Sequence, residues 1–356
     1  MADGIHFDRQ GRLGAIVLDQ PKSLNALTHP MVLALGRQLA RWRRDDDVAA
    51  VLIKGAGERA FCAGGDIKRV HRLRQEGEAD LTRFFRDEYR MNWRIDAFEK
   101  PYVALIDGVT MGGGVGVSAP ADLRIATERT LFAMPETTIG FFPDVGGTAH
   151  LARLPGALGR YLGLTGHRLT GAECLAVGLA THVVPSGRLA ELEDALVGAA
   201  GQNEPLPALR AAADAFAVRD GDAPIRDRLD AIDRIFGASS LDGVLQALAD
   251  EPDGWAREQR EALAAKSPTS LRLTWAQLER GSRLDFAGAL RQEYRMVHRC
   301  MAGHDFFEGV RALLVDKDRT PKWRPATLGD VADGDIDAYF AVPPGGDLTF
   351  DWDEAG

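Results

Sequence analysis

The sequence predicts an α/β core of parallel strands that is followed by an all-helical segment. Strand-like and helix-like segments alternate through roughly the first 190 residues, and strands separated by helices pair in parallel. From about Gly187 onward, Ala, Leu, Arg, Asp and Glu dominate, and the apolar residues recur with helical periodicity. The length of 356 residues, at about 150 residues per domain, fits two domains or one domain with an extension.

We therefore divide the chain into three parts. Residues 1–190 are predicted to form the core, and residues 191–325 a helical extension that packs on it. Residues 326–356 are acidic and rich in Pro and Gly, so we expect an irregular tail.

The elements of the first part follow from local patterns. Thr28 begins a helix, with Pro30 near its first position, and this helix runs to about Arg44, where three aspartates stop it. A long amphipathic helix is expected over 78–98, ahead of Pro101. Short apolar runs predict strands at 5–7 and 15–18 (around a turn at 9–11), 50–54, 102–106, 122–126 and 180–184.

The second part shows only helical periodicity. Pro205, Pro252 and Pro268 separate some of its helices. Helices are predicted at 190–200, 206–219, 225–236, 240–249, 255–265, 270–280, 286–301 and 306–315.

The composition excludes several classes of protein. Apolar residues make up 45% and charged residues 27% of the chain, which is ordinary for a globular protein and excludes disorder over most of it. The 43 basic and 52 acidic residues give a net charge of −9. An acidic chain lacks the broad basic face that nucleic acid requires, so we expect no nucleic-acid partner.

The cysteines and the N-terminus bear on the compartment. Three cysteines, Cys62, Cys174 and Cys300, are too few for a disulfide scaffold and suit a reducing compartment. Residues 1–14 resemble neither a secretory signal nor a transit peptide, and no window reaches the roughly 18 apolar residues that span a bilayer. We expect a soluble cytoplasmic protein with no membrane partner.

Two glycine-rich segments each follow a predicted strand. Residues 60–67 (AFCAGGDI) precede a helix that begins near Asp66, so backbone N–H groups and a helix N-terminus could meet a ligand there. Residues 108–116 (GVTMGGGVG) match neither a Walker A loop nor GxGxxG, which leaves a turn able to offer N–H groups to a developing negative charge. Tight packing between a strand and a helix, without any ligand, explains either segment equally simply.

A third segment, residues 132–147, places two carboxylates in apolar surroundings. Burial raises the pKa of Glu136 and Asp144, which suits a general base or a nucleophile. Asp144 has an alternative role as the N-cap of a helix starting near Gly146. Glu88 could simply belong to a solvated helix face. The eight histidines show no metal-ligand spacing, and Cys62 is interpreted as a small packing residue, so no metal is expected.

Taken in order, these segments resemble the enoyl-CoA hydratase/isomerase (crotonase) superfamily. The resemblance rests on Asn25-Ala26-Leu27, the turn at 61–66, the triple glycine about 48 residues later, and Met134-Pro135-Glu136. More narrowly, the chain resembles the 3-hydroxyisobutyryl-CoA hydrolases over about its first 325 residues. The narrower match includes 61–67, 102–118, 131–147, 164–166, 267–270, 293–295, 307–312 and 321–323.

The resemblance implies a fold and a set of roles. The fold is a spiral of repeated strand-strand-helix units with a helical extension. Gly65 and Gly113 match the amides of the oxyanion hole, Glu136 the catalytic glutamate, Asp144 the aspartate of the hydrolase subfamily, and Glu88 a substrate-contacting glutamate. Matches to the segments that hold coenzyme A are Asn25, Ala26, Leu27, Ala63, Asp66 and Ile67.

One departure from the superfamily separates its reactions. Hydratases resembling crotonase carry a second glutamate just after the triple glycine, where this chain has Gly116, and a small residue where it has Asp144. The exchange fits thioester hydrolysis, in which Glu136 either attacks the carbonyl or activates water. The implied reaction is hydrolysis of 3-hydroxyisobutyryl-CoA in valine breakdown, without any cofactor beyond the CoA of the substrate.

Other readings stay open. An enoyl-CoA isomerase needs only one carboxylate, so Gly116 excludes it less firmly than a hydratase. A non-catalytic acyl-CoA-binding protein would not need buried carboxylates, and a dinucleotide-binding enzyme would need the GxGxxG that is missing. Members of the superfamily commonly form trimers, so a homo-oligomer is compatible with the sequence, although the helices after Gly187 could instead cover that interface.

Overall fold

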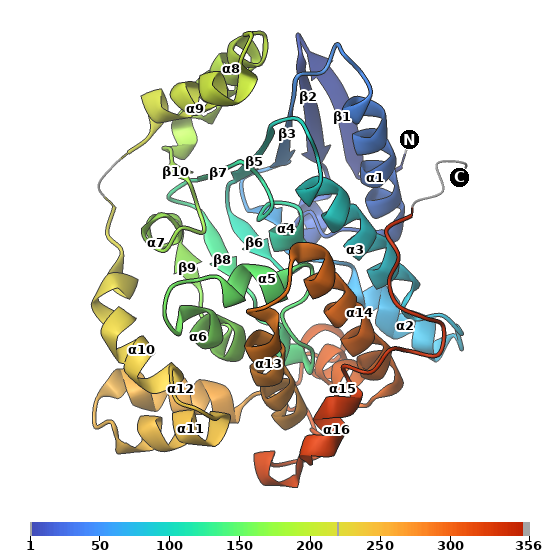
Figure 1. Ribbon diagram of the computed structural model, residues 1–356, viewed down its shortest axis with the longest axis vertical. Coiled ribbons are helices and arrows are strands. Elements are labelled where there is room, and N and C mark those ends of the chain that lie inside the picture. Colours follow the sequence, from blue (N-terminus) through green and yellow to red (C-terminus); the bar gives the residue numbers. More distant parts are fainter. Residues whose placement is uncertain (1, 219–220, 352–356) are drawn as a thin grey trace.

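Two β-sheets lie at the centre of the molecule, and helices cover them (Figure 1). The computed structural model describes residues 2–218 and 221–351. The larger sheet has the order β1-β2-β3-β5-β7-β10, in which only β1 and β2 pair antiparallel. Its strands are β1 (Ile5–Gln10), β2 (Leu13–Leu18), β3 (Ala50–Gly55), β5 (Tyr102–Ile106), β7 (Leu123–Ala126) and β10 (His182–Val183).

The smaller sheet has the order β4-β6-β8-β9, and only β9 runs antiparallel to its neighbour. Its strands are β4 (Ala60–Cys62), β6 (Val109–Met111), β8 (Leu131–Ala133) and β9 (Leu169–Thr170). None of these strands was predicted individually, because they have only two or three residues each, and β4 and β6 run into the glycine segments that were assigned to turns.

The helices are the following: α1 (His29–Arg43), α2 (Ile67–Gln75), α3 (Arg83–Asp96), α4 (Gly113–Gly116), α5 (Gly147–Ala152), α6 (Leu158–Thr165), α7 (Gly171–Ala176), α8 (Leu189–Ala200), α9 (Pro205–Phe216), α10 (Leu229–Phe236), α11 (Leu241–Asp250), α12 (Gly254–Ala264), α13 (Pro268–Gly281), α14 (Phe286–Ala302), α15 (Asp305–Val310) and α16 (Asp333–Ala338). Within the described residues, none of them is both long enough and apolar enough to cross a membrane.

The chain builds the two sheets by repeating one unit. In β3-β4, β5-β6 and β7-β8, the first strand joins the larger sheet and the second strand joins the smaller sheet, and helices follow each pair. This repeat is the predicted spiral of strand-strand-helix units. Since β4, β6 and β8 are parallel, their carboxyl ends meet at one edge of the smaller sheet.

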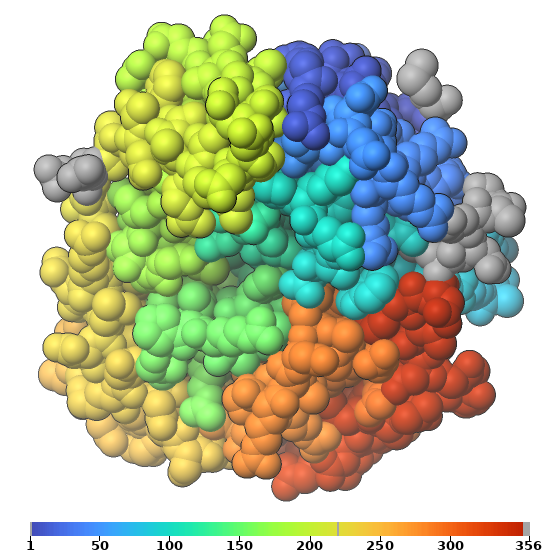
Figure 2. All heavy atoms as spheres, turned by 45° about the horizontal axis from the view of Figure 1, so that its top comes forward, coloured from blue at the N-terminus to red at the C-terminus, as the bar shows by residue number. Residues whose placement is uncertain are grey.

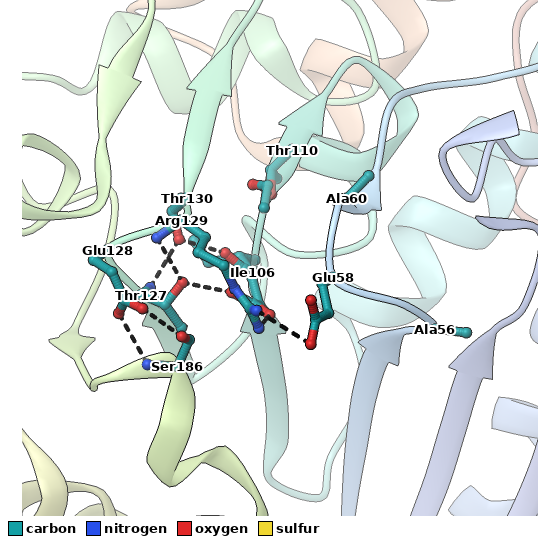
Figure 3. Close-up of polar contacts among 12 residues, drawn as sticks. Ala56, Glu58, Ala60, Ile106, Thr110, Thr127, Glu128, Arg129, Thr130 and Ser186 are labelled. Carbon is teal, nitrogen blue, oxygen red and sulfur yellow. Dashed lines mark hydrogen bonds and ion pairs between the residues drawn. The ribbon is translucent and has the colours of Figure 1, made fainter. Parts of the chain in front are cut away.

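A polar corner fixes the crossing from one sheet to the other (Figure 3). The Thr130 hydroxyl donates to the Ile106 carbonyl (2.6 Å) and accepts from the Thr127 amide (2.8 Å). Arg129 forms an ion pair with Asp107. These bonds join the β5-β6 corner to the β7-β8 corner, so they fix where β6 and β8 begin.

Apart from its edge strand β1, which is mostly exposed, the larger sheet is buried on both faces, and this explains the nearly continuous apolar runs of its other strands. One face points to the main core, where Ile16, Val51 and Ile53 lie. The other face, with Leu52 and Val103 among its residues, packs against α8 and α9. Figure 2 shows these two helices, in yellow-green, directly beside the dark blue N-terminal residues on that face. Helices that we had placed in the extension therefore close one side of the core.

Some of the predicted helices differ from expectation at their ends. The helix predicted over 78–98 begins only at Arg83, because the Asp80 side chain accepts hydrogen bonds from the Thr82 amide and hydroxyl and holds a turn there. The predicted end of another helix, Arg219, lies outside the described residues. The helix expected over 306–315 is α15 followed by a π-helical turn over Arg311–Val315.

We expected an irregular C-terminal segment. It is only partly irregular, because it contains α16. Beyond α16 the chain runs along α14 and α3 (Figure 1). Arg295 pairs with Asp347, and the ring of Phe350 stacks on Trp93 with 5.0 Å between centroids. Residues 352–356 of the predicted tail lie outside the described residues, and the proposed domain boundaries stay predictions.

Candidate active site

The three segments singled out in the sequence meet at the carboxyl ends of β4, β6 and β8. Residues 63–65, 112–113 and 134–136 each follow one of these parallel strands directly. They enclose a cavity of about 180 Å³. Its lining comprises Ala63, Gly64, Gly65, Ile67, Phe84, Phe85, Glu88, Met111, Gly112, Gly113, Pro135, Glu136, Ile139, Phe141, Asp144 and Leu314.

Gly65 and Gly113 lie side by side in this cavity. A methyl group built on Gly113 would come within 3.2 Å of the Gly65 nitrogen. Gly112, with φ +49°, turns the chain ahead of Gly113, a conformation that side chains rarely adopt. No described residue accepts a hydrogen bond from the amide of Gly65 or Gly113. Two backbone donors are therefore left for a group inside the cavity.

Glu136 begins a short 3-10 turn after β8, and its side chain is buried. Its Oε2 has no hydrogen-bond partner among the described residues. Burial, and next the charge of Asp144, raise the pKa of Glu136 well above its usual range. Since a methyl group on Gly112 would lie 3.2 Å from Glu136 Oε1, the carboxyl group is adjacent to the glycine turn.

Asp144 is buried in the same cavity and accepts a hydrogen bond from the Tyr89 hydroxyl (2.9 Å). Burial raises its pKa to about 7, although the bond from Tyr89 works in the opposite direction. The alternative role of Asp144 as a helix N-cap is wrong. The residue that precedes α5 is Gly146, and the amides at that helix end donate to Glu293 and not to the Asp144 side chain.

Glu88 is buried, with 2% of its surface exposed, so it does not belong to a solvated helix face. Its Oε1 has no partner among the described residues, and a methyl group on Gly113 would lie only 2.6 Å from it. Burial and the charge of Asp144 raise its pKa well above the usual range. The cavity thus holds three carboxyl groups whose pKa values burial raises.

The remaining predicted residues divide into two groups. Ala63 and Ile67 line the cavity, whereas Asn25, Ala26, Leu27 and Asp66 do not. The side chain of Asn25 donates to the carbonyls of Ala56 and Ala60. Leu27 pairs with Gly65 through the backbone, and Asp66 accepts from the Arg69 amide to cap α2. These contacts hold the glycine turn in place.

A wider cleft of about 710 Å³ adjoins the cavity and shares Phe84 with it. Its wall carries three arginines and three acidic residues: Arg69, Arg83, Arg86, Asp66, Glu78 and Asp80. A long ligand that enters the cavity past Phe84 would therefore lie along this cleft.

The sequence analysis missed two residues next to the carboxyl groups. Tyr89, which holds Asp144, follows Glu88 directly, but nothing in its local pattern reveals a buried hydroxyl. Glu293 on α14 is fully buried and accepts from the amides of Gly146 and Thr148. Burial raises its pKa to about 8. Only its place in the matching segment 293–295 pointed to it.

Gly116 lies where no larger side chain fits. A methyl group there would come within 2.6 Å of Val145 Cβ and 2.7 Å of Asn92 Nδ2. Neither atom belongs to the end of a long flexible side chain. The second hydratase glutamate is therefore not merely missing, because its space is filled.

The thiols take no part in this arrangement. All three cysteines are free and buried. Cys62 is fully buried in the core, as expected of a packing residue, and this burial raises its pKa to about 12. Within the described residues, no three His, Cys, Asp or Glu side chains are grouped as metal ligands.

Known proteins of one family are similar to this chain over nearly its whole length. The family model "Enoyl-CoA hydratase/isomerase" matches residues 13–340. A curated relative from Danio rerio, named "3-hydroxyisobutyryl-CoA hydrolase, mitochondrial", is 45% identical over 94% of this chain and 88% of its own length. Relatives from rat and human carry the same name.

Two solved structures are similar throughout. A carnitinyl-CoA dehydratase from Mycobacterium thermoresistibile is 39% identical, with a TM-score of 0.91 over 98% of this chain and 99% of that one. An enoyl-CoA hydratase from Rhodobacter sphaeroides is 37% identical, with a TM-score of 0.90 over 98% of this chain and 100% of that one. These similarities confirm the predicted fold class.

Proposed function

The chain belongs to the enoyl-CoA hydratase/isomerase family, and from this premise we propose that it hydrolyses 3-hydroxyisobutyryl-CoA to 3-hydroxyisobutyrate and coenzyme A. One observation carries the proposal. Glu136 and Asp144 share a cavity with two glycine amides that no described residue accepts from, while the space for a second hydratase glutamate is filled.

The amides of Gly65 and Gly113 donate to the thioester oxygen in this proposal. Negative charge develops on that oxygen when a nucleophile adds to the carbonyl carbon. Each such donor contributes about 3–4 kcal/mol, or roughly 10²–10³ in rate. Backbone donors suit the task because they are fixed before the substrate arrives.

Glu136 has two possible tasks at the carbonyl carbon. As a nucleophile it forms a mixed anhydride and expels CoA as a thiolate, after which water hydrolyses the anhydride. As a base it takes a proton from water, which adds to the carbonyl before the thiolate leaves. Asp144 in either route holds the water or adjusts the pKa of Glu136.

Glu88 is the candidate for reading the substrate hydroxyl. Its unpartnered Oε1 is buried beside Gly113, and a buried polar atom without a partner costs about 1–3 kcal/mol. A hydroxyl on the 3-carbon of the acyl group would supply that partner. The cavity of about 180 Å³ and its phenylalanine wall favour a short acyl chain, and the cleft with Arg69 and Arg83 suits the CoA phosphates.

Tyr89 offers a test of the role of Asp144. Because the hydrogen bond from Tyr89 lowers the pKa of Asp144, Tyr89→Phe is expected to raise that pKa above about 7. The limb of the pH profile of kcat that reports Asp144 should then move to higher pH, as measured by thiol release. Tyr102→Phe is the matched control, because its buried hydroxyl has no partner among the described residues. An unmoved profile in Tyr89→Phe would show that Asp144 does not titrate in catalysis.

A hydratase or isomerase is the second candidate, since the two similar solved structures are named as a dehydratase and a hydratase. The filled space at Gly116 weighs against hydration, because it leaves no room for the second glutamate that hydratases carry at that position. Isomerisation needs only a single carboxyl group, so Gly116 does not exclude it. The thiol-release experiment below distinguishes an isomerase from a hydrolase.

The biological setting extends the same proposal. Valine breakdown produces the proposed substrate, and the reaction requires no cofactor. We keep a cytoplasmic location as a prediction, although the names of the curated relatives place those proteins in mitochondria. Assembly into a homo-oligomer is likewise a prediction.

Release of the CoA thiol tests the function directly. We expect fast release from 3-hydroxyisobutyryl-CoA and slow release from acetyl-CoA and crotonyl-CoA. Loss of the crotonyl double bond without thiol release would instead identify a hydratase, and isomerisation of a 3-enoyl-CoA an isomerase. Tight binding of the thioester with no turnover at all would identify a non-catalytic binding protein.

A further inference from the structure

The loop that carries Asp144 places Val145 in a backbone conformation that a valine does not favour. Val145 has φ +53° and Gly146 has φ +90°. A β-branched residue with positive φ is a genuine outlier, and such strain persists only where the surrounding structure imposes it. The contacts that impose it here therefore also decide where Asp144 lies.

Glu293 supplies the first of these contacts. Its Oε2 accepts from the Gly146 amide (2.8 Å) and its Oε1 from the Thr148 amide (2.9 Å). The side chain is fully buried on α14, far along the chain from the loop. Both carboxylate oxygens are thus occupied by the backbone that directly follows Asp144.

Gln277 on α13 supplies the second contact that holds the Asp144 loop. Its amide nitrogen donates to the Pro143 carbonyl (2.6 Å) and to the Thr148 hydroxyl (2.7 Å). Two helices of the C-terminal half therefore hold the loop on both sides of Asp144. On the far side, Val145 packs against Gly116 and fills the space beside it.

We propose that Glu293 is a positioning residue that fixes the Asp144 loop in its strained form, so that the Asp144 carboxylate meets Tyr89 inside the cavity. Gln277 assists from the other side. The inference rests on the proposed function, since it assigns Asp144 a place beside the scissile thioester. It also gives α13 and α14 a task in the active site rather than on its surface.

Another buried glutamate offers a matched comparison. Glu173 also accepts from two backbone amides, those of Thr170 and Ile225, and it caps α7. It does not line the cavity. Glu173→Gln and Glu293→Gln make the same chemical change, because an amide nitrogen cannot accept and one backbone N–H loses its partner in each variant.

The experiment compares these two variants in the full-length protein. Thermal unfolding should show similar destabilisation of both. For Glu293→Gln we expect kcat for 3-hydroxyisobutyryl-CoA to fall about 10–100-fold while KM changes by less than about threefold, since a displacement near 1 Å can cost about 10²-fold in rate. Glu173→Gln should keep the kcat of the wild type. Amide hydrogen exchange of residues 144–148 should quicken only in Glu293→Gln.

Two outcomes would overturn the proposal. Equal kcat in both variants would show that Glu293 only stabilises the fold, and unchanged exchange over 144–148 would show that it does not hold the loop. If the wild type releases no thiol from any substrate, the proposed function fails. The exchange measurement still decides whether Glu293 fixes the loop, because it needs no substrate.

Discussion

Replacing Glu136 by Gln is expected to abolish CoA release while CoA thioesters still bind. The carboxyl group lies in the cavity and adjoins the Gly112 turn, and Gln keeps its size but can neither attack a carbonyl nor take a proton from water. A positioned acid or base contributes about 10²–10⁴ in rate, so kcat should fall by at least that much. Stopped-flow thiol release measures kcat, and calorimetry with a non-hydrolysable thioester analogue measures binding.

The stability of the same variant separates lost chemistry from lost structure. Burial raises the pKa of Glu136, so the folded state binds a proton more tightly there than the unfolded chain does. Stability from this group is present below the unfolded pKa and is lost as the pH rises toward the folded pKa. Gln does not ionise, so the variant does not lose stability at this position as the pH rises. Glu136→Gln should therefore unfold at the same or a higher temperature than the wild type at neutral pH.

Either of two results would contradict this view. Near-normal turnover would remove Glu136 from the chemistry, and lost turnover with lost binding would make it a binding residue only. An acyl group found on the Glu136 peptide after a rapid acid quench would show that it acts as the nucleophile.

The sequence predicted the larger sheet well because its strands are long apolar runs. It did not reveal the smaller sheet, because strands such as β4 and β8 have only three residues. Yet that sheet determines the site, since the parallel ends of its strands bring residues 63–65, 112–113 and 134–136 together. The turn residues could be recognised in the sequence. That they meet at one edge of the smaller sheet could not.

The same limit applies to individual side chains. A pattern of residues can suggest that Glu136 is buried, because Pro135 and the following apolar run surround it. It cannot show that Glu88 points inward, since the helix around it is full of charges. The contacts of Glu293 with Gly146 and Thr148 join residues that are 147 and 145 positions apart in the chain, and no local signal encodes them.

Gly113→Ala is expected to cost nearly as much activity as the loss of Glu136, although it adds only one methyl group. That group would lie 3.2 Å from the Gly65 nitrogen and 2.6 Å from Glu88 Oε1, in the space where the thioester oxygen would be held. Gly113 does not have positive φ, so Ala fits its backbone and the effect is steric. Loss of an oxyanion donor costs about 10²–10³ in kcat, and we expect a fall of that size.

A matched glycine shows whether this loss is specific. Gly163 is also helical and buried, and a methyl group there would touch Leu151 and Leu278 at 3.2 and 3.3 Å, away from the cavity. Gly163→Ala should therefore change kcat by less than the roughly tenfold that corresponds to 1.36 kcal/mol. If Gly113→Ala behaves like this control in thiol release, the Gly113 amide does not face the reacting carbonyl. If it alone loses turnover while its unfolding temperature stays close to that of the wild type, the two glycine amides are the donors on which the hydrolysis depends.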